Sequence, residues 1–433
     1  MATGSTSIST FDPILRIRYL QAVRDLFNDE TTVWGWLDHK STQGGRNMTG
    51  TVRIGRSFSH GAQAAGGTLP TPQTIALANV VVPTKYLYGT LKITNEILKQ
   101  AMGEPGSSAR ALSTQIDGLT RDMKDNRNRM YMGDGAGTIG TVLSVSTNVL
   151  TLKDATDCRK FGIGQIINGF STEAPSATQR SHSGGSAGAP TGVNFLVTAV
   201  TPATPSITVD DNTGGIVAND FLSYTNSRSG TTPNFTRNEP MGLKGAVDDS
   251  NPPLDPTGLF GISRATTVAW QSYVNSAAAN RPISGGLLQA MLDGARISGG
   301  GKIDGIFSPF GVRAEYAELQ QNVRRTVNTN TYAGNTSGGF KEFVEYNGIE
   351  VIPEKHCPQN TMIGVDKDAL WIESWGELDW MDEDGSILDR VQTPGLEPAY
   401  FATLYDYEEL FVHAPARCAK LEAITGADPV AGF

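Results

Sequence analysis

The chain has 433 residues, more than one ordinary hydrophobic core supports, so two or three compact units are expected. Hydrophobic residues make up 39% and charged residues 18%, and the net charge of −9 argues against a basic nucleic-acid-binding surface. Its three widely spaced cysteines form neither a disulfide framework nor a zinc motif, and no apolar run approaches the roughly 20 residues that span a membrane.

The first 93 residues contain two elements that need another surface for stability. Asp12-Pro13 opens a predicted short helix, with apolar residues on one side up to Phe27, which must dock on something. Residues 46–93 then read as two strands joined by a link rich in Gly, Ala, Thr and Pro. A long two-stranded hairpin is marginal in water. Because the hairpin carries Val52 and the valines 80–82, we expect it to lie on a neighbouring subunit.

The stretch from Ser107 to Gly135 predicts one long helix. Ser107 and Ser108 are good N-caps and Gly133 is a good stop. The apolar residues fall at spacings of three and four, but they form a narrow line, and most of the remaining surface is charged. A helix within a core shows a wider apolar face. We therefore expect a rod of roughly 39 Å that touches its own fold along one line and leaves a polar flank free.

Residues 138–240 are poor in charge and rich in Gly, Ser and Thr. Val149–Gly169 resembles Ser206–Asn226, since each has a short alternating strand, an acidic turn and a second strand. Two such halves predict a small β-barrel or sandwich inserted into a larger fold. The segment 171–192 between them reads as a surface loop.

The remainder of the chain predicts mixed α/β structure. Ser284 caps a predicted helix, the stretch "KIDGIFSP" reads as a strand, and residues 310–324 read as a second helix. Asn347-Gly348 and Asp384-Gly385 each lie between apolar, alternating arms and predict hairpins. Residues 399–424 read as a long closing β segment.

One cluster of carboxylates lies beside tryptophans, a pattern that binds sugars or supplies an acid/base pair. The alternative interpretation, which we favour, is a β-hairpin with an acidic, solvated turn. A cation site at the turn fails the EF-hand spacing. The residues are Glu373, Glu377, Asp379, Asp382, Glu383 and Asp384, with Trp371, Trp375 and Trp380.

The other candidate motifs fail on spacing or context. Lys302 lacks the Gly and Ser/Thr positions of a phosphate loop, and Ser59 occupies a glycine position of a nucleophile elbow. His356-Cys357 falls in a predicted loop, and Arg324-Arg325 is more easily explained as a solvated pair. The five histidines have no metal-ligand spacing. The sequence therefore predicts no enzyme, with no catalytic, cofactor-binding or metal-binding residue and no cofactor.

Several stretches, in their order, resemble the major capsid proteins of tailed bacteriophages. They are "GGTLPTPQ", "VVPTKYLYGTLKITNEIL", "RNRMYMGDG", "GLFGISRATTVAW" and "LFVHAPARCAKLEAI". The resemblance covers most of the chain outside residues 138–240. It implies an α+β, Hong Kong 97-type capsid fold with an inserted small β-barrel-like domain.

The resemblance also implies a division into domains. The expected parts are an N-terminal arm (1–45), an extended loop hairpin (46–92), a peripheral domain with the spine helix (93–137), the inserted domain (138–240), a return to the peripheral domain (241–281), an axial domain (282–395) and a closing strand with the C-terminus (396–433).

The function that the resemblance implies is self-assembly into pentamers and hexamers of an icosahedral virion shell. Such a shell encloses double-stranded DNA without sequence-specific binding, assembles in the host bacterial cytoplasm and uses no membrane. The partners implied are a separate scaffolding protein, a portal protein and, as an option, a decoration protein. Two alternatives stay open: an encapsulin-type cellular compartment, and a carbohydrate-binding or glycoside-cleaving β-rich protein.

Two departures from the family pattern carry expectations of their own. Some members cross-link subunits through a lysine in the extended loop, but residues 46–84 contain none and Lys85 is the first lysine after Lys40. We therefore expect no covalent cross-linking of subunits. Many members begin with a long charged segment that is cut away, whereas only ten Ser/Thr-rich residues precede the arm helix here. We therefore expect no large N-terminal cut.

Overall fold

A computed structural model describes residues 31–41, 45, 47–94, 108–182, 192–324, 344–382, 389–391, 399–426 and 428. The chain forms two compact units. Unit 1 draws on residues 1–46, 83–131 and 372–409, and unit 2 draws on residues 47–82, 132–371 and 410–433. Helices and strands are mixed in both, so the predicted α+β class is confirmed. The helix predicted after Asp12 lies outside the described residues.

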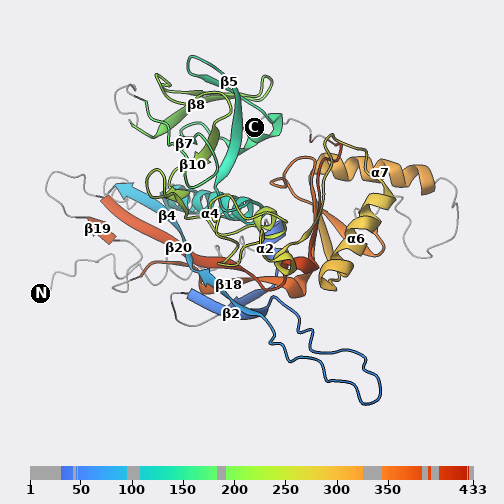
Figure 1. Ribbon diagram of the computed structural model, residues 1–433. Helices are drawn as coiled ribbons and strands as arrows, with labels where there is room; N and C mark the ends of the chain where they lie inside the picture. Colours follow the sequence, from blue (N-terminus) through green and yellow to red (C-terminus); the bar gives the residue numbers. More distant parts are fainter. Residues whose placement is uncertain are drawn as a thin grey trace, which may run out of the picture. The chain divides into compact units, whose positions relative to one another are not determined.

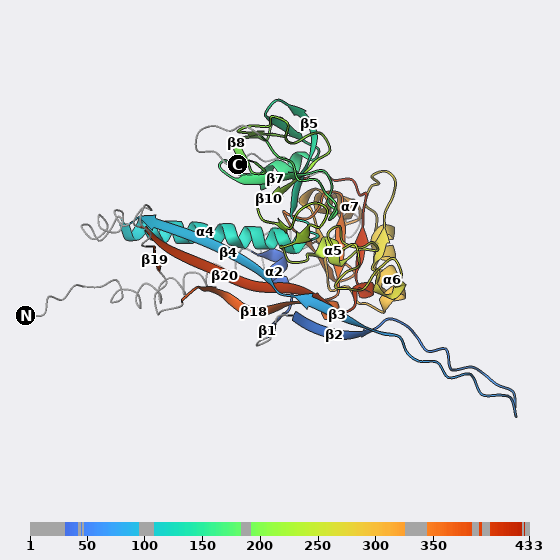
Figure 2. The ribbon, with the colours of Figure 1, turned by 60° about the vertical axis from the view of Figure 1, so that its left-hand side comes forward.

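Unit 1 is built on a five-stranded sheet with one long helix against it (Figure 2). The long strand β20 pairs antiparallel with β4 over ten residues, and β1 runs parallel to β18. Its elements are α2 (Thr32–Trp36), β1 (His39–Ser41), β4 (Lys85–Thr94), α4 (Ser108–Met132), β18 (Leu370–Trp380), β19 (Asp389–Val391) and β20 (Ala399–Val412).

The helix α4 confirms the predicted rod and ends one residue before Gly133. Ile116 and Met123 of its apolar line pack against Leu404 and neighbouring residues of the sheet. The contact is close at Gly89 of β4, where a Cβ atom would lie 2.3 Å from the Met123 sulfur. Ser107 and the side chain of Ser108 lie outside the described residues.

The expectation of a free polar flank on this helix is wrong for its second half. Lys124, Arg127, Asn128 and Arg129 are all less than 7% exposed. A cationic side chain is buried only where partners offset the loss of its hydration. For Arg127 these partners are carboxylates of β20, far away in the sequence.

Unit 2 contains a closed six-stranded barrel in the order β10-β5-β6-β9-β8-β7 (Figure 1). Its interior is filled by aliphatic and aromatic side chains such as Ile139, Phe195 and Ile207. The strands are β5 (Thr138–Ser146), β6 (Val149–Leu152), β7 (Ile166–Phe170), β8 (Phe195–Thr201), β9 (Ser206–Val209) and β10 (Phe221–Tyr224), with a 3-10 helix, η2 (Ala155–Lys160), after β6.

The two halves of the predicted repeat occupy equivalent places in this barrel. β6 of the first half pairs with β9 of the second, and β7 pairs with β10. The acidic turns are also equivalent. Asp154 accepts bonds from the backbone and hydroxyl of Thr156, and Asp211 accepts the same two bonds from Thr213. One local sequence pattern thus builds the same turn twice.

The segment after the barrel is organised around a buried arginine. Arg264 is fully buried and donates to the backbone carbonyls of Gly245, Ala246, Ser250 and Trp270. Burial lowers the pKa of its guanidinium to about 10. The short elements here are β11 (Arg228–Ser229), β12 (Thr236–Arg237), α5 (Leu243–Ala246) and η3 (Val268–Trp270).

Unit 2 also contains a six-stranded sheet in the order β13-β21-β17-β14-β16-β15, with α6 and α7 packed on it. Ser284 caps α6 as predicted, by accepting from the Leu287 amide at 3.3 Å. The elements are β13 (Tyr273–Asn275), α6 (Gly285–Gly299), β14 (Gly305–Ser308), α7 (Phe310–Arg324), β15 (Val344–Tyr346), β16 (Ile349–Pro353), β17 (Met362–Val365), η4 (Lys367–Ala369), η5 (Pro415–Arg417) and β21 (Ala419–Leu421).

The two predicted hairpins have different outcomes. Asn347 and Gly348 both have positive φ angles and join the antiparallel pair β15–β16, so this hairpin is confirmed. The turn at Asp384-Gly385 lies outside the described residues. The flanking strands β18 and β19 are both neighbours of β20 in the sheet, rather than a hairpin pair.

Candidate assembly surface

A second hairpin is formed by β2 (Asn47–Arg53) and β3 (Leu77–Pro83). At its base Val80 and Val82 are fully buried, and the Val81 amide donates to the Phe260 carbonyl at 3.2 Å. Gly50 lets the ring of Phe411 approach, since a Cβ atom there would lie 2.8 Å from it. The valines that we assigned to a neighbouring subunit are therefore largely buried within their own chain.

Beyond β2 and β3 the two arms of the hairpin stay together as a narrow ribbon (Figure 2). The Ile54 amide donates to the Ala76 carbonyl at 3.0 Å, and the Ser57 hydroxyl donates to the Gln73 carbonyl at 2.9 Å. The ribbon turns back near Gly67, whose amide donates to the Ala64 carbonyl. These bonds fix the direction of the ribbon without a core of its own.

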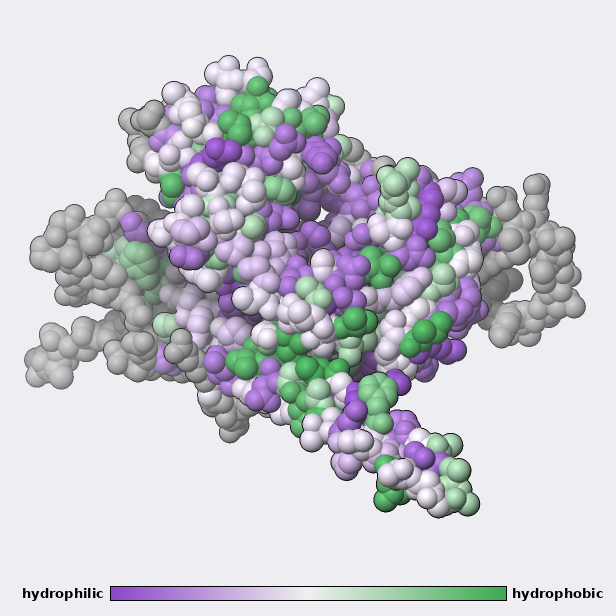
Figure 3. Space-filling view, in the orientation of Figure 1, coloured by the Kyte–Doolittle hydropathy of each residue, from purple (hydrophilic) through white to green (hydrophobic). Residues whose placement is uncertain are grey.

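The far part of this ribbon, residues 58–73, is called the hairpin tip. Large apolar side chains are exposed on it and next to it: Phe58 is 70%, Leu69 86% and Leu77 63% exposed. In Figure 3 the projecting hairpin shows green, hydrophobic patches among pale residues. Exposed apolar groups gathered on one element usually mark an interaction site. The part of the chain that the structure describes leaves this one uncovered.

A second exposed surface lies on the sheet of unit 1. Tyr86 and Tyr88 of β4 and Tyr405 and Tyr407 of β20 form a connected group of rings, called here the tyrosine ridge. Ring centroids are 5.0 Å apart for Tyr86–Tyr407 and 4.9 Å for Tyr405–Tyr407, and the Tyr88 and Tyr407 hydroxyls are 3.2 Å apart. Burial and the neighbouring phenols raise the pKa of Tyr407 to about 12.

Sequence reasoning did not single out the tyrosine ridge, although a signal exists. The stretches "KYLY" and "LYDY" place tyrosines two apart in two predicted strands. Residues two apart on a strand share one face. Only the register of β4 with β20, Tyr88 opposite Tyr405 and Tyr86 opposite Tyr407, brings the four rings together.

The segment 31–41 is attached to unit 1 through a charged, buried cluster. The Trp34 indole donates to both oxygens of Glu408, at 3.2 and 3.0 Å, and its ring stacks under the Arg127 guanidinium at 3.9 Å. The Val33 amide donates to the Asn128 side chain at 3.1 Å. Three separate contacts thus hold the segment on α4 and β20.

Arg127 balances two buried carboxylates in this cluster. Its Nη1 atom lies 2.5 Å from Asp406 and 3.1 Å from Glu408, and the Tyr131 hydroxyl donates to Glu408 at 3.0 Å. Burial and the nearby Glu408 nevertheless raise the pKa of Asp406 to about 7. Proton uptake by Asp406 therefore lies near neutral pH.

Comparison with solved structures identifies the fold. A chain of the Cyanophage A-1(L) capsid asymmetric unit aligns with 92% of this chain and 93% of that chain, with a TM-score of 0.52 and 13% identity. The chain has the Hong Kong 97-type capsid fold. A scan against protein-family models found no match, and a search of curated proteins found none either.

Two further solved structures are similar at lower scores. A chain from Mycobacterium phage Bobi has a TM-score of 0.45 and 9% identity over 91% of both chains. An encapsulin from Synechococcus elongatus has a TM-score of 0.41 and 10% identity over 92% of this chain and 89% of that chain. The fold assignment rests on the cyanophage capsid chain.

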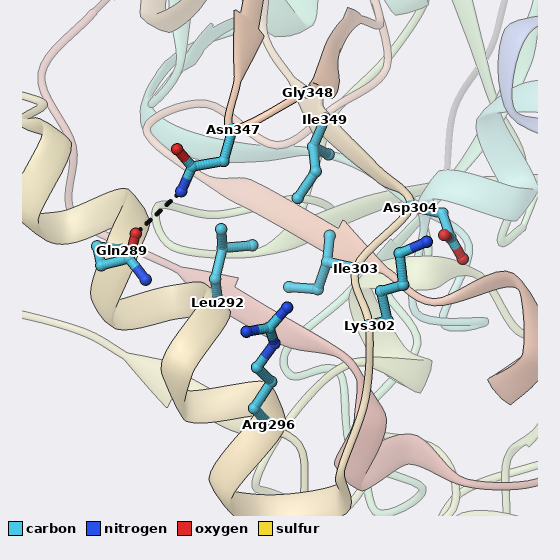
Figure 4. A pocket seen from close by; sticks show the side chains of 9 residues that line it. All are labelled: Gln289, Leu292, Arg296, Lys302, Ile303, Asp304, Asn347, Gly348 and Ile349. Carbon is cyan, nitrogen blue, oxygen red and sulfur yellow. Dashed lines mark hydrogen bonds between the residues drawn. The ribbon is translucent and has the colours of Figure 1, made fainter.

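The capsid-fold chain has a pocket of about 330 Å³ beside α6 (Figure 4). Its floor is apolar, from Leu292 and Ile303, and Arg296 and Lys302 lie at its rim. The predicted turn closes one side, where the Asn347 amide donates to Gln289 at 3.0 Å. The backbone amide of Lys302 donates to the Asp366 carboxylate, which fixes the loop that contains Lys302. This loop is not a phosphate loop.

The carboxylates and tryptophans of the acidic cluster are not brought together as a site by the described residues. Glu373 is fully buried, and Trp380 belongs to the apolar contact with α4. Trp371 stacks on Phe411 with ring centroids 4.5 Å apart. Asp379 accepts a bond from the Trp380 amide. The side chains of Glu377, Glu383 and Asp384 lie outside the described residues.

The remaining candidates have ordinary structural surroundings. Cys357 is buried, and burial raises the pKa of its thiol well above the usual value, which keeps it protonated and a poor nucleophile. The Ser59 hydroxyl lies 2.6 Å from that of Ser57. Among the described residues no group of three or more potential ligands could hold a metal ion. No described helix is long and apolar enough to cross a membrane.

Proposed function

We propose that the chain is the major capsid protein of a tailed phage, which assembles into pentamers and hexamers of an icosahedral shell around double-stranded DNA. The observation that carries this proposal is the uncovered hairpin tip of a chain with a capsid fold. The base of the hairpin is fixed to its own subunit, while the exposed side chains of Phe58 and Leu69 are available for contact with another molecule. In this proposal the chain has a structural role.

The domain division expected from the family resemblance is part of this proposal. In it residues 1–45 form the arm, 46–92 the extended loop and 93–137 the spine region. The barrel lies within the inserted domain, 138–240. The net charge of −9 supports a shell that encloses DNA without adhering to it.

The first experiment is expression of the chain alone, followed by negative-stain electron microscopy and size-exclusion chromatography with light scattering. We expect closed shells, tubes or capsomer rings. If the chain stays a monomer of 46.2 kDa, it is co-expressed with scaffolding proteins of tailed phages. A monomer under both conditions contradicts the proposal, and shells that hold protein cargo instead of DNA support the cellular-compartment alternative.

A matched pair of variants connects the assembly to the hairpin. Residues 58–73 are replaced by a Gly/Ser linker of equal length. We expect this variant to lose assembly, while the subunit itself stays folded. Replacing the exposed residues 217–219, between β9 and β10 of the barrel, in the same way serves as the control. In addition, mature particles are expected to give a single band on a denaturing gel, because residues 46–84 contain no lysine. A ladder of covalent oligomers would contradict that.

A further inference from the structure

We propose that the pocket beside α6 binds a small organic carboxylate, whose charged group pairs with Arg296 and whose apolar body lies on Leu292 and Ile303. This pocket, called here the α6 pocket, is lined by three segments of unit 2 (Figure 4). They are α6, the loop 302–304 and the turn between β15 and β16. A ligand bound there needs no second subunit, because one chain supplies all of these residues.

The floor of the α6 pocket is apolar. Gln289, Leu292 and Arg296 lie three and four positions apart on α6, so their side chains share one face of the helix. Leu292 is 9% and Ile303 3% exposed, and both belong to the apolar core of the six-stranded sheet and its helices. The half-buried Ile349 adds an apolar side chain from the turn. An apolar body placed on this floor is removed from water, which favours binding.

The charged side chains of the lining carry a net positive charge. They are Arg296, Lys302 and Asp304, all exposed, and in Figure 4 the Arg296 guanidinium points from α6 toward the floor. Within the part of the chain that the structure describes, the side chains of Arg296 and Lys302 form no ion pair. Asp304 accepts a bond from the Lys367 backbone amide at 3.1 Å. Two cations and one carboxylate leave one positive charge, which a bound monoanion balances.

The walls of the α6 pocket are fixed before a ligand arrives. On one side the Lys302 amide donates to the Asp366 carboxylate at 2.8 Å. On the other side Gln289 accepts bonds from the Asn347 side chain at 3.0 Å and from the Tyr346 hydroxyl at 3.1 Å. A site whose walls already restrain one another loses little conformational freedom on binding, so more of the contact energy becomes affinity.

The lining selects the class of ligand. An inorganic anion would leave the apolar floor in water, and a neutral apolar molecule would leave the cations without a partner. A phosphate monoester carries a charge of about −1.5 to −2 at pH 7, more than the lining balances. A guanidinium pairs with a carboxylate through two parallel bonds. The volume of about 330 Å³ is at the lower end for small-molecule pockets, so the apolar body is compact.

Equilibrium dialysis of the full chain tests this site, with naphthoate as the probe. Naphthamide has the same rings without the charge, and acetate has the charge without the rings. We expect one naphthoate per chain, binding of naphthamide that is at least about tenfold weaker, and no displacement of naphthoate by an equal concentration of acetate. Naphthamide that binds as tightly as naphthoate, or no naphthoate binding at millimolar concentration, overturns the proposal.

Substitutions of exposed cations locate the binding. Arg296→Met is expected to weaken naphthoate binding about tenfold without weakening naphthamide binding, and Lys302→Met is expected to act in the same direction. Lys153→Met removes an exposed cation of the barrel and is the matched control, expected to bind like the parent. Naphthoate is also expected to slow hydrogen exchange in residues 285–304 and 344–349. Parent-like naphthoate binding by Arg296→Met, or an equal loss in Lys153→Met, overturns the site.

Discussion

Arg127→Met is the change that best tests the account of the buried cluster in unit 1. Arg127 is 3% exposed and is the cation between Asp406 and Glu408. Methionine fills much of the volume but leaves both carboxylates. Glu408 keeps its bonds from Trp34 and Tyr131, whereas Asp406 loses its ion pair with Arg127.

The expected loss follows from this imbalance. Removing one partner of a buried ion pair typically costs about 3–5 kcal/mol. The pKa of Asp406 is about 7 in the folded chain and about 3.9 in an unfolded one. Folding thus disfavours the charged form of Asp406. The ionisation of Asp406 therefore lowers the free energy of unfolding as pH rises from about 4 to 7, and this loss disappears as pH falls. Loss of Arg127 raises this pKa further.

We therefore expect Arg127→Met to lower the free energy of unfolding by about 3–5 kcal/mol at pH 8, and by at least about 1 kcal/mol less at pH 5. Urea unfolding at both pH values measures the loss. Hydrogen exchange of peptides from α4 and β20 locates it in unit 1. Because Asp406→Asn removes the stranded charge, the double variant is expected to recover part of the loss at pH 8.

Arg121→Met is the matched control, since Arg121 is exposed on the same helix. It is expected to change stability by no more than about 0.5 kcal/mol. A loss for Arg127→Met that is below about 1 kcal/mol, or that is the same at pH 5 and pH 8, would refute the reasoning. Either result would mean that burial does not disfavour the charged form of Asp406.

Three further changes have clear expected outcomes. Arg264→Met leaves four backbone carbonyls without their donor and is expected to lower the free energy of unfolding by about 3 kcal/mol or more. Arg264→Lys is expected to restore little, because an ammonium lacks the planar fork of a guanidinium. Thermal unfolding measures both. Gly89→Ala places a methyl group against Met123 and is expected to cost about 1–3 kcal/mol, with Gly118→Ala, where a Cβ meets nothing, as control. The buried cysteines, of which Cys418 has a pKa raised to about 12, are expected to resist iodoacetamide at pH 8 until the chain unfolds; rapid labelling of native protein would contradict their burial.

The elements that could be predicted are those with local signals. The limits of α4 follow from its spacing and from Gly133, and the hairpin at Asn347-Gly348 follows from its turn residues. The acidic turns at Asp154 and Asp211 are likewise local, which is why the repeat within the barrel was visible in the sequence.

The features that could not be predicted depend on distant partners. Nothing near Arg127 in the sequence indicates that it is buried, because Asp406 is 279 residues away. The second of the two strands predicted within residues 46–93 is divided at Thr84 into β3 and β4, and β4 joins β20. This pairing also creates the tyrosine ridge. Register between strands of such separation is fixed by tertiary packing, so a single sequence does not reveal it.

The closure of the barrel has a consequence for the proposed shell, in which the subunit would be present in many copies. A sheet with open edges presents unpaired amides and carbonyls, to which the strand of another molecule can attach. In a particle every such edge would be repeated with each subunit, so even a weak attachment would join particles many times over. The ring of β5 to β10 leaves no such edge within the barrel. Within the proposed shell, a domain of this form would add no strand edge through which one particle could attach to another.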